Sequence, residues 1–150
     1  MPDPHVARIV NAAREWIGTP YEHQHSTKGR GTDCLGLIRG VWREVVGREP
    51  VHVPPYTADW SESSRQERLW DAARQWLIEI PVDDQRVGTV VLFRMHTGSV
   101  AKHVAILAQD PSGMATIIHA YSRRSVVETP LTPHWRDRIV AQFEYPIGSK

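Results

Sequence analysis

Cys34 is the only cysteine in this 150-residue chain, and its neighbours give the thiol a position in which it could react. It lies between the polar pair Thr32-Asp33 and an apolar pattern of helical period. With Thr32 or Asp33 as the N-cap, Cys34 falls in the first turn of a helix, where unpaired N–H groups and the helix dipole favour negative charge. This position predicts a lowered thiol pKa and a nucleophilic thiolate. The competing interpretation is a small buried apolar residue.

A nucleophilic cysteine needs a base, usually histidine, and a further group that orients this base. Two of the eight histidines, His103 and His119, lie inside apolar strand patterns, where either one alone would be typical of a satisfied core residue. The Asp-Pro-Ser-Gly sequence of residues 110–113 predicts a three-residue hairpin loop with a bulge, in which Asp110 faces Met114. Opposed residue numbers then sum to 224, so both histidines point to one face as diagonal neighbours. A two-residue loop would place them on opposite faces.

The elements that must position these side chains follow from the apolar periodicity. Helical patterns cover residues 6–17 and 35–45, and a third helix is expected from Ser64, because Ser64 and Glu67 have the spacing of a capping box. About five strands are then expected from short apolar runs at residues 87–93, 103–109, 114–121, 125–129 and 139–145. This order predicts one α+β domain over residues 1–150, with N-terminal helices packed on a central antiparallel sheet.

Length and composition exclude several classes of protein. An apolar fraction of 41% and a charged fraction of 23% are typical of a globular chain and exclude disorder as the main state. The net charge of +1 argues against bulk binding to nucleic acid or anionic lipid. One cysteine excludes an intrachain disulfide. No apolar run approaches the roughly 20 residues of a membrane span, and the first residues do not resemble a secretory signal, so we expect synthesis in the cytoplasm.

Five stretches of the sequence together resemble the NlpC/p60 peptidases, a papain-like family of cell-wall hydrolases. They follow the family's order and spacing over about residues 5–122, and they are Trp16–Tyr21, Thr32–Gly36, Gly88–Phe93, Lys102–Leu107 and Ile117–Ala120. The stretches around the cysteine and the two histidines are specific to the family, whereas the stretch after Gly88 is weak by itself. The resemblance implies a papain-like fold and an activity that needs no metal or cofactor.

The resemblance also implies a role for each matching residue. Cys34 matches the nucleophile, His103 the general base, and His119 the third polar residue, which orients the base. Tyr21 matches a tyrosine that lies beside the thiol in many members, and Asp33 matches the aspartate before the nucleophile. The implied reaction is acyl transfer through a thioester, with the oxyanion held by the backbone N–H of Cys34 and with the Tyr21 hydroxyl as a candidate donor.

The implied substrate is a peptidoglycan stem peptide, cut between D-glutamate and the dibasic residue. Asp33 and Glu22 are candidate contacts for the dibasic residue, although a helix cap and a loop charge explain them equally well. Leu35 stands where most bacterial members have serine, and Thr89 stands where aspartate is usual. The form resembles the phage-tail and gene-transfer-agent branch, whose members are carried in a particle, with tail or baseplate proteins as partners, and act in the cell wall or periplasm.

Three alternatives remain open from the sequence. Cys34, His103 and His119 form an acceptable ligand set for a zinc-dependent amidase. A tail-tip protein could keep the peptidase-like fold as a structural or assembly component, although a scaffold does not need the complete set of three residues. Transfer of the acyl group to an acceptor other than water shares the acyl-enzyme step with hydrolysis.

Overall fold

The structure is a computed structural model that describes residues 3–50, 56, 67–121 and 124–147. The helices in these residues are α1 (Pro4–Arg14), α2 (Cys34–Val45), α3 (Arg68–Trp76) and α4 (Pro133–Arg136). Asp3 caps α1 by accepting the backbone N–H of His5 at 2.9 Å. The apolar residues of α2 recur at helical spacing and are buried, as Leu37, Val41 and Val45 illustrate. The helix expected over 35–45 is therefore confirmed.

Six strands form one antiparallel sheet in the order β3-β8-β4-β5-β6-β7. Their bounds are β3 (Ile78–Ile80), β4 (Val90–Arg94), β5 (Ala101–Gln109), β6 (Ala115–Ala120), β7 (Val126–Pro130) and β8 (Ile139–Glu144). A short separate pair, β1 (Ser26–Thr27) and β2 (Gly31–Thr32), precedes α2. The expected α+β class with helices before strands is confirmed, and the sheet has one strand more than the five expected.

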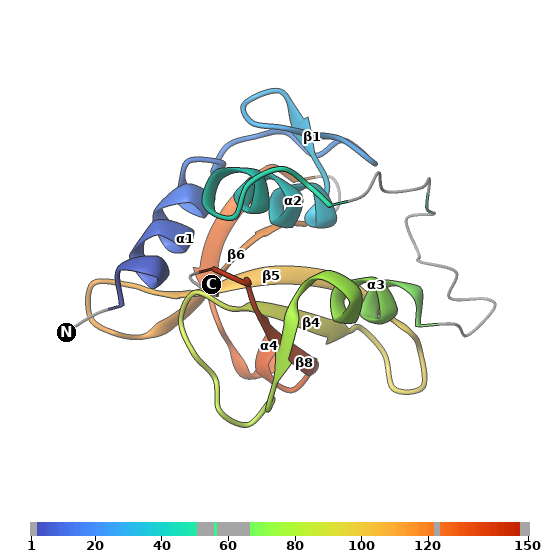
Figure 1. Cartoon of the computed structure of the whole chain (residues 1–150). Coiled ribbons are helices and arrows are strands. Elements are labelled where there is room, and N and C mark those ends of the chain that lie inside the picture. The colour runs from blue at the N-terminus through green and yellow to red at the C-terminus, as the bar shows by residue number, and fades with distance from the viewer. Residues whose placement is uncertain (1–2, 51–55, 57–66, 122–123, 148–150) are drawn as a thin grey trace.

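The two faces of the sheet carry separate apolar cores. The larger core joins α1, α2 and α3 to the even-numbered residues of β5, such as Val104 and Ile106. The smaller core contains Leu131, just before α4, and Trp135, within α4. These two residues pack against the odd-numbered β5 residues Ala105 and Leu107. Figure 1 shows α1 and α2 side by side above the sheet, with α4 below it. A side chain on β5 therefore faces either the three helices or α4, according to its parity.

The hairpin between β5 and β6 has the expected register. Ile106 pairs with Ile118 and Leu107 with Ile117, so opposed residue numbers sum to 224. Gly113 has a φ of 91°, the left-handed conformation that a three-residue loop with a bulge requires at this position. The predicted register, in which His103 and His119 lie on the same face of the sheet, is therefore confirmed.

The middle of the chain contains a third helix and one further short strand. Helix α3 begins at Arg68, and the expected start at Ser64 lies outside the described residues. Glu67 makes no side-chain cap to the helix; its carboxylate accepts the N–H of Ala101 at 2.9 Å and a guanidinium N–H of Arg94 at 3.0 Å. Strand β3 was not expected, because its three residues follow α3 almost directly and are too few to show a strand period.

In the described parts of the chain, none of the helices combines the length and the apolar character that crossing a bilayer would require.

Candidate active site

The thiol of Cys34 lies at the first residue of α2, as the sequence predicted. Asp33 is the N-cap, and its Oδ1 accepts the backbone N–H of Gly36 at 2.8 Å. Cys34 is buried, with 8% of its surface exposed, and packs in the larger core. Its Sγ donates a hydrogen bond to the carbonyl oxygen of Lys102 on β5, at 4.0 Å. The cap therefore directs the thiol to the backbone of the strand that carries His103.

A local separation of β5 from β6 leaves room for the sulfur. The even-numbered residues of β5 direct their backbone N–H and C=O groups to β6, because the odd-numbered ones bond to β4. The ladder with β6 stops at the pair Ile106–Ile118. The carbonyl of Lys102 and the N–H of Val104, which a longer ladder would give to β6, bond to the sulfur of Cys34 instead. The sulfur of Cys34 thus bonds to the β5 backbone groups that β6 would otherwise pair with.

The two histidines form a hydrogen-bonded pair just beyond the last residues of this ladder. Nε2 of His103 and Nδ1 of His119 are 2.8 Å apart, and Nε2 of His119 lies 3.3 Å from the hydroxyl of Thr129 on β7. Both imidazoles are buried. Aromatic rings contact the pair at centroid distances of 5.2 to 6.0 Å, and they belong to Phe93, Tyr121 and Trp135. Each ring is therefore fixed by a polar partner and by packing.

The thiol and the histidine pair lie beside the same part of β5 but on different faces of the sheet. Cys34 comes from the face covered by α2, whereas His103 packs with Phe93 and Trp135 on the other face. Within the described residues, the hydrogen bond of the thiol goes to the backbone and not to a histidine. Since His103 uses Nε2 to reach His119, a proton transfer between the thiol and this imidazole would have to use Nδ1.

Burial determines the resting protonation of all three groups. It raises the pKa of the Cys34 thiol to about 12, and the Asp33 carboxylate adds to this shift, while the N–H groups of Val104, Leu35 and Cys34 itself oppose it. Burial and the neighbouring His119 hold the pKa of His103 well below its usual range. Burial lowers the pKa of His119 to about 4. The expectation of a lowered thiol pKa is therefore wrong, because desolvation outweighs the helix N-terminus.

Tyr21 and Asp33 lie beside the thiol but differ in what they can contact. Tyr21 is half-buried against the core cluster that contains Cys34, and burial and the nearby Cys34 and Asp33 raise its hydroxyl pKa to about 12. Asp33 is 1% exposed. Its Oδ2 accepts the N–H of Gln24 at 2.8 Å and the hydroxyl of Tyr56. The Asp33 carboxylate is thus occupied by protein donors, whereas Glu22 is exposed.

Sequence reasoning missed two polar residues of this site. Tyr56 donates its hydroxyl to Asp33, and its carbonyl oxygen lies 2.9 Å from Nε2 of His23. It stands in a proline-rich stretch without periodicity, so no local pattern indicated it. Thr129 bonds to His119 across the β6–β7 pair. The strand pattern of residues 125–129 predicted its element, but a β-strand threonine carries no signal of a polar role.

The described residues contain no group of three or more His, Cys, Asp or Glu side chains arranged to hold a metal ion. The ring nitrogens that face each other in His103 and His119 are already engaged with one another at 2.8 Å. The arrangement of Cys34, His103 and His119 therefore does not fit the zinc alternative.

Comparison with known proteins identifies the class. The sequence profile described as the NlpC/P60 family matches residues 18–144, and the chain belongs to this family. The match includes all five residues that the sequence had placed at the site. A comparison with curated proteins found no significant match.

Solved structures with the same fold cover nearly the whole chain. The NlpC/p60 domain of the peptidoglycan hydrolase SagA is 23% identical, with a TM-score of 0.62, and the match covers 93% of this chain and 97% of that domain. An NlpC/P60 family protein from Bacillus cereus is 20% identical, with a TM-score of 0.62, over 96% of this chain but 41% of its own. A family protein from Staphylococcus aureus is covered over 42% of its length. This chain thus spans less than half of those two proteins.

One structural neighbour lacks activity. RipD from Mycobacterium tuberculosis is described as a non-catalytic NlpC/p60 domain protein adapted to peptidoglycan binding; it is 11% identical, with a TM-score of 0.55, and the match covers 97% of this chain and all of that one. Membership of the family therefore does not by itself establish catalysis.

Proposed function

We propose that the chain is a cysteine peptidase that hydrolyses an amide bond in peptidoglycan stem peptides. One observation supports the proposal: the buried thiol bonds to the backbone on either side of His103, where the β5–β6 ladder has ended, and His103 is hydrogen-bonded to His119. The family and the likeness to the fold of SagA support the substrate class.

The reaction begins from a neutral thiol and a neutral imidazole. Nδ1 of His103 takes the thiol proton as Sγ of Cys34 attacks the amide carbonyl, and His119 holds the ring through its bond to Nε2. The oxyanion forms near the N–H groups of Cys34 and Leu35, which bond to the sulfur at the start of α2. His103 gives the proton to the leaving amine, and it then removes a proton from the water that cleaves the thioester.

The finer assignments extend this proposal. The bond cut is the one between D-glutamate and the dibasic residue, with exposed Glu22 as the acidic contact and buried Asp33 as a positioning residue. The protein acts in the cell wall as part of a phage-tail or gene-transfer-agent particle, with tail or baseplate proteins as partners. Their support is the Asp33-Cys34-Leu35 form of the motif.

A non-catalytic role in binding peptidoglycan is the second candidate. Two observations favour it: the described thiol makes no hydrogen bond to a histidine, and RipD has the same fold without catalysis. Such a protein would bind stem peptides without changing them.

Mass spectrometry of purified muropeptides after incubation with the protein separates these candidates. We expect the wild type to produce fragments that identify the bond, and Cys34→Ala to produce none. His134→Ala is the matched control, because His134 is exposed on α4; this variant should match the wild type. Cleavage by Cys34→Ala at the wild-type rate would remove the cysteine mechanism, and binding without cleavage by the wild type would support the second candidate. Transfer to another acceptor would appear as a product heavier than the hydrolysed one.

A further inference from the structure

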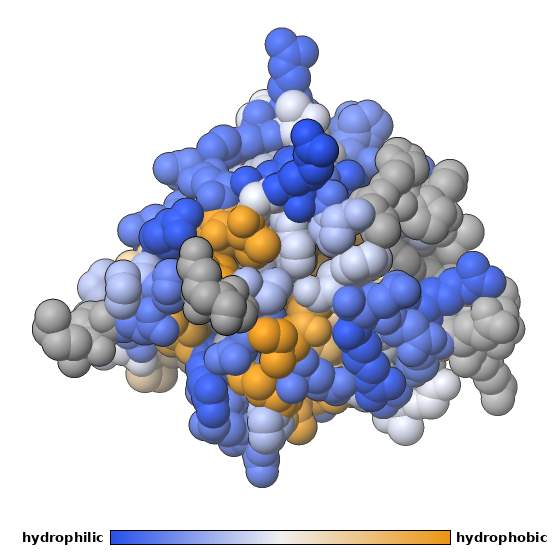
Figure 2. Space-filling model, in the orientation of Figure 1, coloured by the Kyte–Doolittle hydropathy of each residue, from blue (hydrophilic) through white to orange (hydrophobic). Residues whose placement is uncertain are grey.

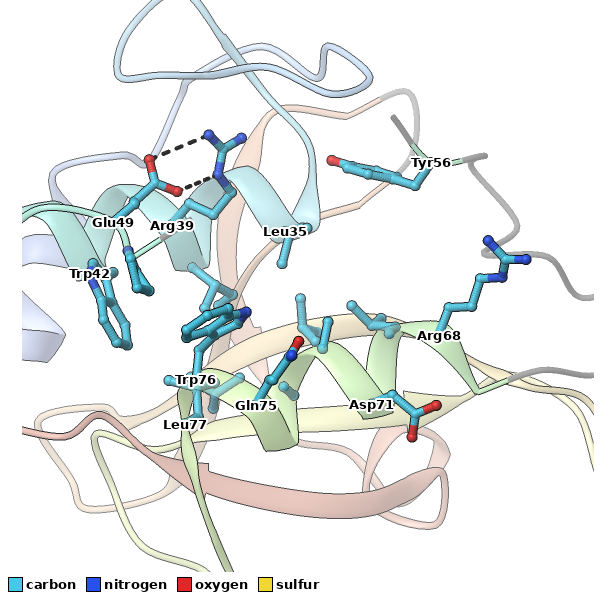
Figure 3. A pocket seen from close by; sticks show the side chains of 17 residues that line it. Leu35, Arg39, Trp42, Glu49, Tyr56, Arg68, Asp71, Gln75, Trp76 and Leu77 are labelled. Carbon is cyan, nitrogen blue, oxygen red and sulfur yellow. Dashed lines mark hydrogen bonds and ion pairs between the residues drawn. The ribbon is translucent and has the colours of Figure 1, made fainter. Parts of the chain in front are cut away.

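A cavity of about 390 Å³ lies between α2 and α3, with β4 and β5 as its floor. Its volume is within the range of about 300–1,000 Å³ that is typical of small-molecule sites. Leu35, Ile38 and Trp42 line it from α2, and Leu69, Ala73 and Trp76 line it from α3. Figure 3 shows these two helices on either side of the cavity. In Figure 2, hydrophobic surface gathers in the middle of this face between hydrophilic margins.

The cavity shares lining residues with the surroundings of the thiol. Leu35 follows Cys34 directly in α2, and Val104 supplies both a side chain to the cavity floor and a backbone N–H to the sulfur. Tyr56 lines the cavity and donates its hydroxyl to Asp33, the residue before Cys34. The cavity therefore lies close to the start of α2, where the proposed nucleophile stands.

The polar atoms of the walls are largely engaged with the protein. Nε of Arg39 bonds to Oε1 of Glu49 at 2.6 Å, the pair drawn with dashed lines in Figure 3. The indole N–H of Trp42 donates to the carbonyl oxygen of Arg48 at 3.1 Å. The Tyr56 hydroxyl is given to Asp33. What remains for a ligand is mainly hydrocarbon, so a charged or strongly polar group would lose its hydration without compensation.

We propose that this cavity binds an aliphatic group of the substrate, either an apolar amino-acid side chain or a short acyl chain, next to the carbonyl attacked by Cys34. The inference rests on the proposed function for its nucleophile and adds a determinant of specificity that the polar stem peptide does not require. Such a group would stabilise the transition state by burial, at about 0.8 kcal/mol per methylene, or close to fourfold in rate.

Acylation of the protein by p-nitrophenyl esters of increasing chain length tests the proposal. Sγ of Cys34 forms a bond to the ester carbonyl carbon, p-nitrophenolate leaves, and His103 takes the thiol proton. From the acetyl to the octanoyl ester we expect the burst rate to rise by at least about tenfold. Esters of N-acetylglycine and N-acetylleucine form the second arm; a larger gain with leucine assigns the cavity to a side chain, and a larger gain with octanoyl assigns it to an acyl chain. No gain in either arm would overturn the proposal.

Filling the cavity provides the matched test. Ala73→Phe and Ala72→Phe each place a ring in it, and the octanoyl-to-acetyl ratio should fall towards one. Ala7→Phe carries the same change on an exposed position of α1 and should keep the wild-type ratio. An unchanged ratio in folded Ala73→Phe and Ala72→Phe, with folding checked by circular dichroism, would contradict the proposal.

A binding measurement separates the cavity from the nucleophile. If Cys34→Ala shows the same burst as the wild type, the proposed function fails, but octanoate binding to that variant still tests the cavity. Trp42 and Trp76 line it, so their fluorescence should change as octanoate binds to Cys34→Ala. Octanoate should leave the fluorescence of the double variant Cys34→Ala/Ala73→Phe unchanged. Equal changes in both variants, or in neither, would overturn the proposal.

Discussion

The resting thiol of Cys34 is neutral, because its burial and the neighbouring Asp33 carboxylate both oppose the thiolate. Three backbone N–H groups favour the charged form, but in this surrounding they do not compensate for the loss of water. His103 is neutral for the same reason and is further discouraged from protonation by His119. A preformed ion pair is therefore not part of the resting state, and the proposed attack by Cys34 would begin with the transfer of its proton.

Alkylation by iodoacetamide should show this resting state directly. At pH 7 we expect Cys34 in the folded protein to react at least about tenfold more slowly than in the urea-unfolded chain, whose thiol titrates near pH 8.5. The rate in the folded protein should keep rising above pH 9, since the thiol pKa is raised to about 12. Faster labelling of the folded than of the unfolded protein at pH 7 would show an activated thiolate and contradict this description.

At the scale of elements, the start of α2 is the part that positions the thiol of Cys34, the proposed nucleophile. Asp33 joins three segments of the chain through Gly36, Gln24 and Tyr56. Gly36 lies against the preceding loop, where an added Cβ would come within 2.0 Å of the carbonyl oxygen of His25. The helix start is thus held by a buried cap and by close backbone packing, both of which fix the thiol against β5.

Removing this cap should cost more than removing a solvent-exposed one. Asp33→Ala should lower the free energy of unfolding by about 2–4 kcal/mol, because the cap is lost and the buried donors lose their acceptor. Asp3→Ala is the matched control: its cap to His5 on α1 is exposed, and its loss should cost about 0.5–1 kcal/mol. Urea unfolding followed by circular dichroism measures both. Equal losses would show that Asp33 acts as an ordinary cap.

The sequence allowed prediction of elements with a clear local signal. The Pro-Ser-Gly turn determined the β5–β6 register, and apolar periodicity with a polar cap located α2. Strand β3 has only three residues and therefore no readable period. The partners Tyr56 and Thr129 became visible only in the fold, because they contact Asp33 and His119 from other elements of the chain. The prediction of a lowered thiol pKa was wrong for a related reason, because the burial that raises the pKa depends on the tertiary fold.

At the scale of the whole molecule, the sheet separates two cores and brings their polar residues together at one break in its ladder. The helical face supplies the thiol, and the α4 face supplies the histidine pair. Both imidazoles are neutral in the folded protein and would have to be protonated in acid. The arrangement therefore links the stability of the molecule to pH.

Acidification should destabilise the protein through these imidazoles. The pKa of His119 falls to about 4 on folding, so between about pH 6.5 and pH 4 the unfolded chain binds more protons and folding is weakened as the pH falls. The loss for His119 reaches about 3 kcal/mol at pH 4, and His103 adds a loss of the same sign. Urea unfolding from pH 7 to pH 4 should show a shallower decline for His119→Gln than for the wild type. Identical declines would contradict the assignment.

The central claim is that Cys34 and His103 act as one catalytic unit, and a double-mutant cycle on kcat/KM for the cleaved stem peptide tests it most directly. Cys34→Ala and His103→Ala should each lower kcat/KM by about 10⁴ or more, and the double variant should be no slower than either single one, because residues that act together are strongly non-additive. If the two losses instead multiply in the double variant, or if either single variant keeps wild-type activity, the thiol and the histidine work independently and the account is wrong.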